Sequence, residues 1–258
     1  MNQILKYFAA PVAALLLSGC AGSLSTPVPG GKVNYDTKAN NAYIVFARPE
    51  FVGAALSNTI VEFDPATYKT KLVGTLGPQT KIVYVTTPGT HYFYMNGGEN
   101  DDMIKITAKK GMEYYVHTEI GMGVVVGRFY FKPLRYQNLA LAESLKEKSC
   151  NANVLNQYGF KEVRDETSDI TGNKKYHTVQ HNIDIECRKG VIKYANYSGE
   201  SLETMQKATL IQPNAEAVKY YQEHIPSYVK EIKKAFSRWE KEAMPKTALK
   251  AEDGQALK

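Results

Sequence analysis

The chain has few of the residues that mark specialised classes of protein. Its 258 residues include three cysteines, enough for at most one disulfide, and one tryptophan. No apolar run reaches the length of about 20 residues that a membrane-spanning helix needs. The patterns Gly-x-Ser-x-Gly and His-Glu-x-x-His and the calcium-binding loop are also absent. The sequence therefore offers no marked hydrolase, zinc-protease or calcium site, and we predict a protein that is not an enzyme and has no cofactor.

Charge of one sign is not in large excess either. The formal net charge is +6, and 43% of the residues are hydrophobic and 22% charged, which is typical of a globular protein. Without the first 19 residues, 31 basic and 26 acidic side chains remain, or +5. This excess is compatible with a nearby anionic surface, but it does not indicate binding to nucleic acid.

The first 20 residues have the features of a secretion signal. Lys6 precedes an almost wholly apolar stretch over residues 7–17, and Leu-Ser-Gly-Cys follows, ending at Cys20. This ending resembles the lipobox of bacterial lipoproteins. The resemblance implies cleavage after residue 19 and attachment of diacylglycerol to Cys20, and Ala21 behind it implies the outer membrane. The alternative is an ordinary signal in which the cysteine occurs by chance.

The residues after this cysteine have the composition of a linker. Residues 20–41 consist mainly of small and polar residues, proline and glycine. Such a composition is typical of a flexible tether. We therefore expect a lipidated tether between the membrane and the folded part of the chain.

Residues 42–136 contain about eight short strand-like segments separated by turn signals. One example is the pair "TKIVYVTTPG" and "THYFYM", in which Pro88 and Gly89 mark the turn. Short strands at this spacing predict an antiparallel β-sandwich or barrel. The segments "AYIVFARP", "PGTHYFYM" and "KKGMEYYVHTEI" resemble the PEGA-like, prealbumin-like β-sandwich domains of uncharacterised bacterial lipoproteins. That resemblance implies the fold and the location, and it implies no activity.

Residues 137–200 are expected to add a short helix and a hairpin to the sandwich. They contain Cys150 and Cys187, an even pair once Cys20 is lipidated. In an oxidising compartment such a pair predicts a disulfide, and two free buried thiols are the alternative.

Residues 201–258 are expected to form a long amphipathic helix followed by a polar tail. From residue 214 to 243, apolar residues recur at three- and four-residue spacing and keep their phase across Pro226, which predicts one kinked helix or two coaxial ones. The predicted stripe comprises Val218, Tyr221, Ile225, Tyr228, Ile232, Ala235 and Trp239. The stripe either docks on the sandwich in cis or binds a partner, and in the second case Tyr228, Ile232 and Trp239 are the candidate contacts.

Other residues suggest chemistry only weakly. His177 and His181 have helical metal-ligand spacing, but on a strand they stand about 13 Å apart, too far for one zinc. The glycine-rich residues 121–127 lack the strand-and-helix context of a dinucleotide site and indicate a bend. Four strand tyrosines could form an aromatic platform for a sugar or peptide, or could simply pack in the sheets: Tyr92, Tyr94, Tyr114 and Tyr115.

The sequence thus predicts a mainly β protein with a C-terminal α-helix: an antiparallel β-sandwich, a hairpin insertion and an amphipathic helix. We expect a periplasm-facing lipoprotein of the outer membrane that binds or scaffolds an envelope protein without catalysing a reaction. Binding of a glycan or peptide ligand is the alternative function.

Overall fold

A computed structural model describes most of the chain beyond its first 23 residues, so the predicted signal and Cys20 lie outside the described residues. The described residues are 24–36, 38–51, 53, 55–97, 99–121, 123–124, 127–164, 171–178, 183–196, 202–242, 244 and 248–257.

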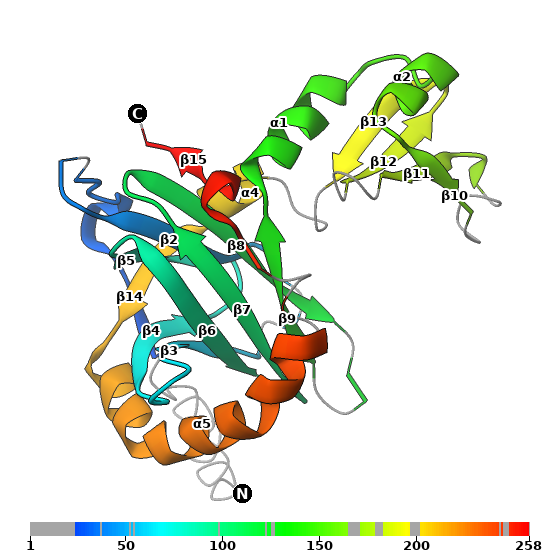
Figure 1. The fold of residues 1–258 in the computed structure, drawn as a ribbon. Helices are drawn as coiled ribbons and strands as arrows, with labels where there is room; N and C mark the ends of the chain where they lie inside the picture. The colour runs from blue at the N-terminus through cyan, green and yellow to red at the C-terminus, as the bar shows by residue number, and fades with distance from the viewer. Residues whose placement is uncertain are drawn as a thin grey trace, which may run out of the picture.

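Two sheets pack face to face and form the main body of the described chain, here called the sandwich (Figure 1). The first sheet has the order β1-β14-β5-β2-β8-β15, and β9 also pairs with β8. Its strands are β1 Ser25–Pro27, β2 Ala42–Arg48, β5 Thr80–Thr86, β8 Met112–Gly121, β9 Arg128–Leu134, β14 Thr209–Pro213 and β15 Gln255–Ala256. The second sheet has the order β4-β3-β6-β7. Its strands are β3 Asn58–Phe63, β4 Thr70–Leu76, β6 Gly89–Gly97 and β7 Asn100–Ala108.

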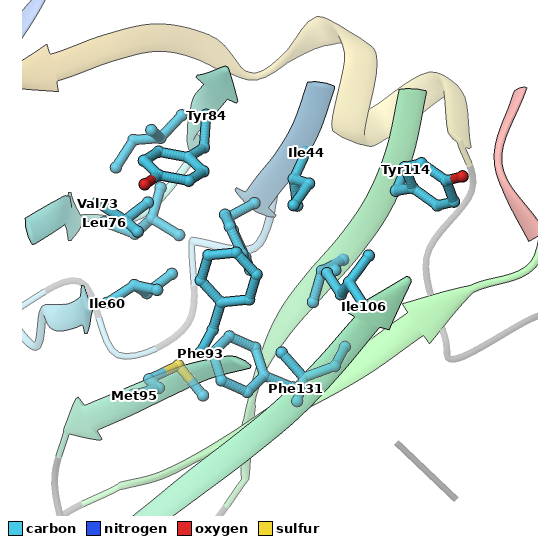
Figure 2. Packing of buried hydrophobic residues seen from close by; sticks show 14 of the residues in the cluster. Ile44, Ile60, Val73, Leu76, Tyr84, Phe93, Met95, Ile106, Tyr114 and Phe131 are labelled. Atoms are coloured by element: carbon cyan, nitrogen blue, oxygen red, sulfur yellow. The ribbon is translucent and has the colours of Figure 1, made fainter. Parts of the chain in front are cut away.

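The core between the sheets follows from the two-residue alternation of their strands. Ile44 and Tyr114 enter it from the first sheet, and Ile60 and Ile106 enter it from the second (Figure 2). All four side chains are fully buried. Burial of this apolar surface, at about 25 cal/mol per Å², is the main force that holds the sheets together. The predicted β-sandwich is confirmed.

The first sheet is mixed rather than wholly antiparallel. Strand β2 pairs with β8 in parallel, with Val45 opposite Tyr115, and β14 pairs with β5 in parallel. The strand patterns could not show this, because a parallel pair joins segments that are far apart in the sequence. Strand β2 is central and buried throughout, which explains its continuous apolar run.

Side chains join the two sheets along β7 and β9. Asn100 accepts the N–H of Phe129 at 2.8 Å and donates its amide to the carbonyl of the same residue at 2.7 Å. Asp102 accepts the N–H of Phe131 at 2.7 Å. These bonds satisfy backbone groups of β9 that no neighbouring strand pairs at this point, so the sandwich is closed on this side.

Helix α5, Ala215–Glu242, covers the outer face of the second sheet (Figure 1). Asn214 caps its start by accepting the N–H of Ala217 at 2.9 Å. The helix continues through Pro226, as the unbroken apolar phase predicted. The stripe differs from the predicted one at three positions: Val218 is 43% exposed, and Ala217 and Phe236 are buried although neither was predicted.

The start of the described chain is attached to the sandwich. Strand β1 pairs with β14, and Ser25 Oγ donates to the carbonyl of Thr75 at 2.6 Å. Further along, the Tyr35 hydroxyl donates to the buried Glu113 carboxylate. The prediction of a flexible tether over residues 20–41 is therefore wrong for residues 24–36, because the pairing of β1 and the hydrogen bond from Tyr35 to Glu113 attach a segment whose composition resembles a linker.

The C-terminal residues are also part of the body. Leu249 is 1% exposed and belongs to the sandwich core, and β15 extends the first sheet beside β8. The carboxylate of Asp253 accepts the N–H of Lys250 at 2.7 Å and closes the last 3-10 turn, Ala251–Asp253. The expected polar tail is wrong for residues 248–257, because one buried leucine and two strand residues attach it to the sandwich.

A small module stands apart from the sandwich after β9 (Figure 1), and we call residues 136–196 the stapled module. It comprises α1 Tyr136–Leu145, α2 Ala152–Gln157, β10 Lys161–Val163, β11 Lys174–Thr178, β12 Ile183–Arg188 and β13 Val191–Asn196. The four strands form an antiparallel sheet in sequence order. After the module, the short helix α4, Leu202–Lys207, connects to β14 of the sandwich.

Candidate functional site

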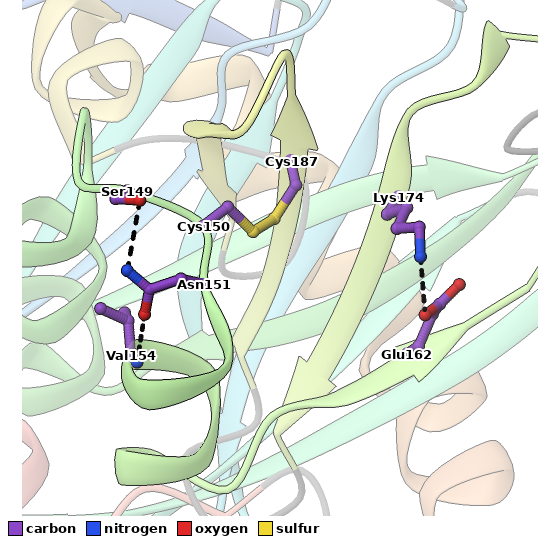
Figure 3. The surroundings of a disulfide bond; sticks show 7 residues. All are labelled: Ser149, Cys150, Asn151, Val154, Glu162, Lys174 and Cys187. Atoms are coloured by element: carbon purple, nitrogen blue, oxygen red, sulfur yellow. Dashed lines mark hydrogen bonds and ion pairs between the residues drawn. A yellow bond between two sulfur atoms is a disulfide. The ribbon is translucent and has the colours of Figure 1, made fainter.

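The predicted disulfide is present in the stapled module. Cys150, before α2, and Cys187, on β12, are bonded with their Cα atoms 5.9 Å apart (Figure 3). Asn151 beside it caps α2 by accepting the N–H of Val154 at 3.1 Å. The predicted hairpin is accordingly a four-stranded sheet stapled to a helical segment.

The module has a hydrophobic core of its own. Every buried member of this core lies between residues 145 and 192, and so do the disulfide partners. The buried members are Leu145, Leu155, Phe160, Ile183, Ile185, Cys187 and Ile192. Because the sandwich contributes no buried residue to this cluster, the module can present its surface without disturbing the main core.

One edge of the module sheet is open among the described residues. Strand β10 pairs with β11 on one side only, and its three residues are exposed. Val163 at its end is 45% exposed. An edge strand with an exposed valine can accept a strand from another protein, because its outward N–H and C=O groups have no ladder partner.

The residues proposed for partner binding on the helix are covered. Tyr228, Ile232 and Trp239 are 3%, 0% and 7% exposed and pack on the outer face of β3 and β6. Tyr94 of β6 meets Tyr228 edge to face, with ring centroids 6.2 Å apart. Docking in cis is what the structure contains, and these three side chains cannot contact a partner while the helix lies on the sheet.

The four strand tyrosines do not form a platform. Tyr92 and Tyr94 face α5, Tyr114 lies in the sandwich core, and Tyr115 faces α4 on the other side of the first sheet. Because the strands alternate, neighbours such as Tyr114 and Tyr115 must point to opposite faces. Their role is packing in the sheets, the alternative interpretation of the sequence.

A polar cluster that the sequence did not reveal lies at the rim of the sandwich core. The carboxylate of Glu62 on β3 accepts two hydrogen bonds, one from His91 Nδ1 of β6 at 2.6 Å and one from the Tyr84 hydroxyl of β5 at 2.5 Å. His91 Nε2 meets the carbonyl of Thr87 at 2.8 Å. Burial disfavours the charged carboxylate, but the bonds from His91 and Tyr84 outweigh it and lower the pKa of Glu62.

This cluster is not arranged for catalysis by its histidine. Both ring nitrogens of His91 lie within hydrogen-bonding distance of acceptor oxygens, so neither nitrogen is open to a substrate proton or a metal ion while these contacts persist. The bond to Glu62 raises the pKa of His91 accordingly. The Glu62–His91 pair could be predicted only from the register between β3 and β6. That register places Glu62 opposite Phe93 and therefore diagonal to His91.

The other histidines lie elsewhere. His117 on β8 is 1% exposed, and its Nε2 forms a hydrogen bond with the Glu50 carboxylate. His224 on α5 stacks on Tyr220, with ring centroids 3.9 Å apart. His177 lies on β11, whereas His181 and parts of the glycine-rich residues 121–127 lie outside the described residues. Among the residues that the structure describes, no three His, Cys, Asp or Glu side chains are grouped to hold a metal.

Two surface grooves differ in their chemistry. The larger, of about 880 Å³, lies between β1, the turn from β4 to β5, and the start of α5. Among the residues that the structure describes, no Asp, Glu, Lys, Arg or His lines it. The smaller, of about 480 Å³, is lined by several charged residues, including Glu62, Lys71 and His91.

The chain has no recognised relatives in two comparisons. No protein-family model matches it, and no curated protein matches its sequence. The resemblance to lipoproteins and to PEGA-like domains thus remains a prediction from the quoted motifs. In the described part of the chain, none of the helices combines the length and the apolar character needed to cross a bilayer.

Proposed function

We propose that the protein is a lipid-anchored lipoprotein of the bacterial outer membrane that presents the stapled module to an envelope protein partner and catalyses no reaction. The single observation that carries this proposal is the module's separate, disulfide-closed core. A small sheet with its own core and an open edge adds nothing to the core of the sandwich, and its exposed β10 edge suits the addition of a partner strand.

Two further features support the location. A disulfide is typical of an oxidising compartment such as the periplasm. The Leu-Ser-Gly-Cys motif supplies the anchor at Cys20, and Ser25 is already paired to the sandwich. Five residues span at most about 18 Å of extended chain. The anchor would therefore hold the sandwich close to the lipid surface by its β1 side.

Site-specific photo-cross-linking in living cells tests the partner. A photoreactive amino acid replaces Val163 on β10 in one variant and Val85 on β5 in the matched control, since these strand valines are 45% and 47% exposed. We expect a cross-linked envelope protein from position 163 and none from position 85. Absence of a cross-link at 163, or the same products from both positions, would contradict the proposal.

The anchor needs its own test. Cys20→Ser should abolish labelling by radioactive palmitate and leave the uncleaved precursor, because no thiol remains to receive diacylglycerol. A wild-type protein whose mature form begins at a residue other than Cys20 would refute the lipoprotein assignment without bearing on the module.

A further inference from the structure

The larger groove lies far from the β10 edge in the chain and has a chemistry of its own. Its walls come from segments remote in sequence: Ser25 of β1, Thr75 of β4, Thr209 of β14 and Tyr220 of α5. At about 880 Å³ it is in the size range of natural ligand sites. Only the folded chain brings these segments together, so the groove could not be predicted from a local sequence motif.

The described lining is neutral. In a chain with 22% charged residues, none of the described residues that line this groove is Asp, Glu, Lys, Arg or His. Phosphate, sulfate, carboxylate and ammonium groups are normally bound through charge-assisted hydrogen bonds or ion pairs. A groove without ionic partners favours a neutral ligand.

The polar groups that are present are hydroxyls and an amide. Exposed Ser57 and Thr209 and the amide of Gln79 line the groove. Thr80 already donates its hydroxyl hydrogen to the carbonyl of Gly77 at 2.7 Å, so its oxygen is left as an acceptor. Such a mixture of neutral donors and acceptors matches a ligand that is itself rich in hydroxyls.

The turn from β4 to β5, which lines the groove, is held by hydrogen bonds. Gln79 has a φ of 55°, which is uncommon for a residue other than glycine, and its carbonyl accepts the N–H of Thr209 at 2.9 Å. This bond and the one from Thr80 to Gly77 hold the turn in place. A fixed turn lowers the entropy that is lost when a ligand binds.

An aromatic ring stands at the border of the groove. Tyr220 is 40% exposed and is held by stacking on His224, with an angle of 22° between the ring planes. An exposed tyrosine combines an apolar face with a hydroxyl, which suits the apolar face and the hydroxyls of a sugar ring.

An extended peptide fits the same groove less well. Peptides usually bind beside a sheet by adding a strand to a free edge. Here β14 is paired on both sides, by β1 and β5, and the Ser25 hydroxyl occupies the Thr75 carbonyl on the edge of β4. We propose that this groove binds a neutral glycan, with Tyr220 against a sugar face and the hydroxyl-bearing walls around its edges.

Titration calorimetry on the full-length protein tests this site, in a detergent without a sugar head group so that the detergent cannot compete. The probes are the neutral tetrasaccharide of N-acetylglucosamine and, for comparison, an anionic oligogalacturonate of the same length. The variants are Tyr220→Ala and, as a matched control, Val218→Ala, which truncates another exposed side chain of α5 outside the groove.

We expect saturable binding of the neutral tetrasaccharide, weakened about ten-fold by Tyr220→Ala, consistent with the loss of an aromatic contact, and unchanged by Val218→Ala. Far-ultraviolet circular dichroism and the melting temperature establish that both variants are folded. No saturable binding, equal or tighter binding of the anionic oligosaccharide, or equal affinity of the wild type and Tyr220→Ala would overturn the proposal. None of these outcomes depends on the lipid anchor or on the module.

Discussion

Removal of the disulfide should unfold the stapled module and leave the sandwich folded. The variant is Cys150→Ala combined with Cys187→Ala. These cysteines are 37 positions apart, and opening a loop of that length costs about 4 kcal/mol in the chain-entropy model. Seven buried core residues are seen in the described part of the module, and a core of that size supplies only a few kcal/mol of net stability. The expected loss is therefore comparable to the whole stability of the module.

Hydrogen exchange followed by mass spectrometry measures the effect element by element. A loss of about 4 kcal/mol corresponds to about a thousand-fold lower protection, since each 1.4 kcal/mol is a factor of ten. We expect this loss in β12 and β13 and none in β2, whose neighbours lie in the separate core of the sandwich. Reduction of the wild-type protein with dithiothreitol is the control for the loss of the side chains, and it should reproduce the result.

Two results would refute this reasoning. If β2 loses protection together with β12, the module and the sandwich unfold as one unit, and the separate core has no energetic meaning. If β12 keeps its protection in both the variant and the reduced protein, the disulfide does not restrain the module.

Three further predictions concern the sandwich. The Glu62–His91 pair should stabilise the fold most between pH 4.5 and 6.5, the ordinary pKa values of the two groups. The pKa of Glu62 is lowered in the folded state, so its contribution is lost as pH falls through that lowered value, and the pKa of His91 is raised, so its contribution is lost as pH rises through that raised value. Urea titrations of Glu62→Gln should show neither change in stability, and a pH profile like that of the wild type would contradict the pairing. Burial raises the pKa of Asp102 to about 6 from 3.8, so the acid binds protons more tightly in the folded state and stability should fall by about 3 kcal/mol as pH rises between these values; Asp102→Asn should lack this fall, and its persistence would assign it to other groups. Docking of α5 is tested in two ways. Ile232→Ala should lower the free energy of unfolding by about 3 kcal/mol, because Ile232 is fully buried between α5 and the sheet. Trp239 emission in the wild type should be blue-shifted and independent of dilution, and red-shifted emission from the folded monomer would show that the helix is not docked.

Local patterns predicted the elements of this protein well. Two-residue alternation and turn dipeptides such as Pro88-Gly89 are properties of short segments, so eight strands could be expected between residues 42 and 136, and β2 to β9 occupy that range. The continuous apolar phase across Pro226 likewise predicted one helix, and the parity of the remaining cysteines predicted the Cys150–Cys187 bond. Each of these signals is carried by neighbouring residues or by simple counting.

The pairing of distant segments could not be predicted in the same way. Strand β1 was expected to be tether and β15 to be tail, because three and two residues carry too little pattern to distinguish a strand from a linker. Only the tertiary structure supplies their partners, β14 and β8. The apolar face of the helix, which the sequence left as a candidate partner surface, is covered by the sheet. An apolar stripe predicts that a helix face is buried, but it does not identify the surface that buries it.

The candidate sites divide along the same line. The lipid-attachment motif at Cys20 is contiguous, so the sequence alone predicts the anchor. The Glu62–His91 pair depends on strand register, and the neutral groove depends on four segments that meet only in the folded chain. Sequence determined the strands β2 to β9 and the long helix α5, because those elements are long enough for local periodicity to reveal them. The structure decided which surfaces remain open, because exposure depends on contacts between residues as distant as Thr70 and Tyr221, whose hydroxyls are 2.9 Å apart.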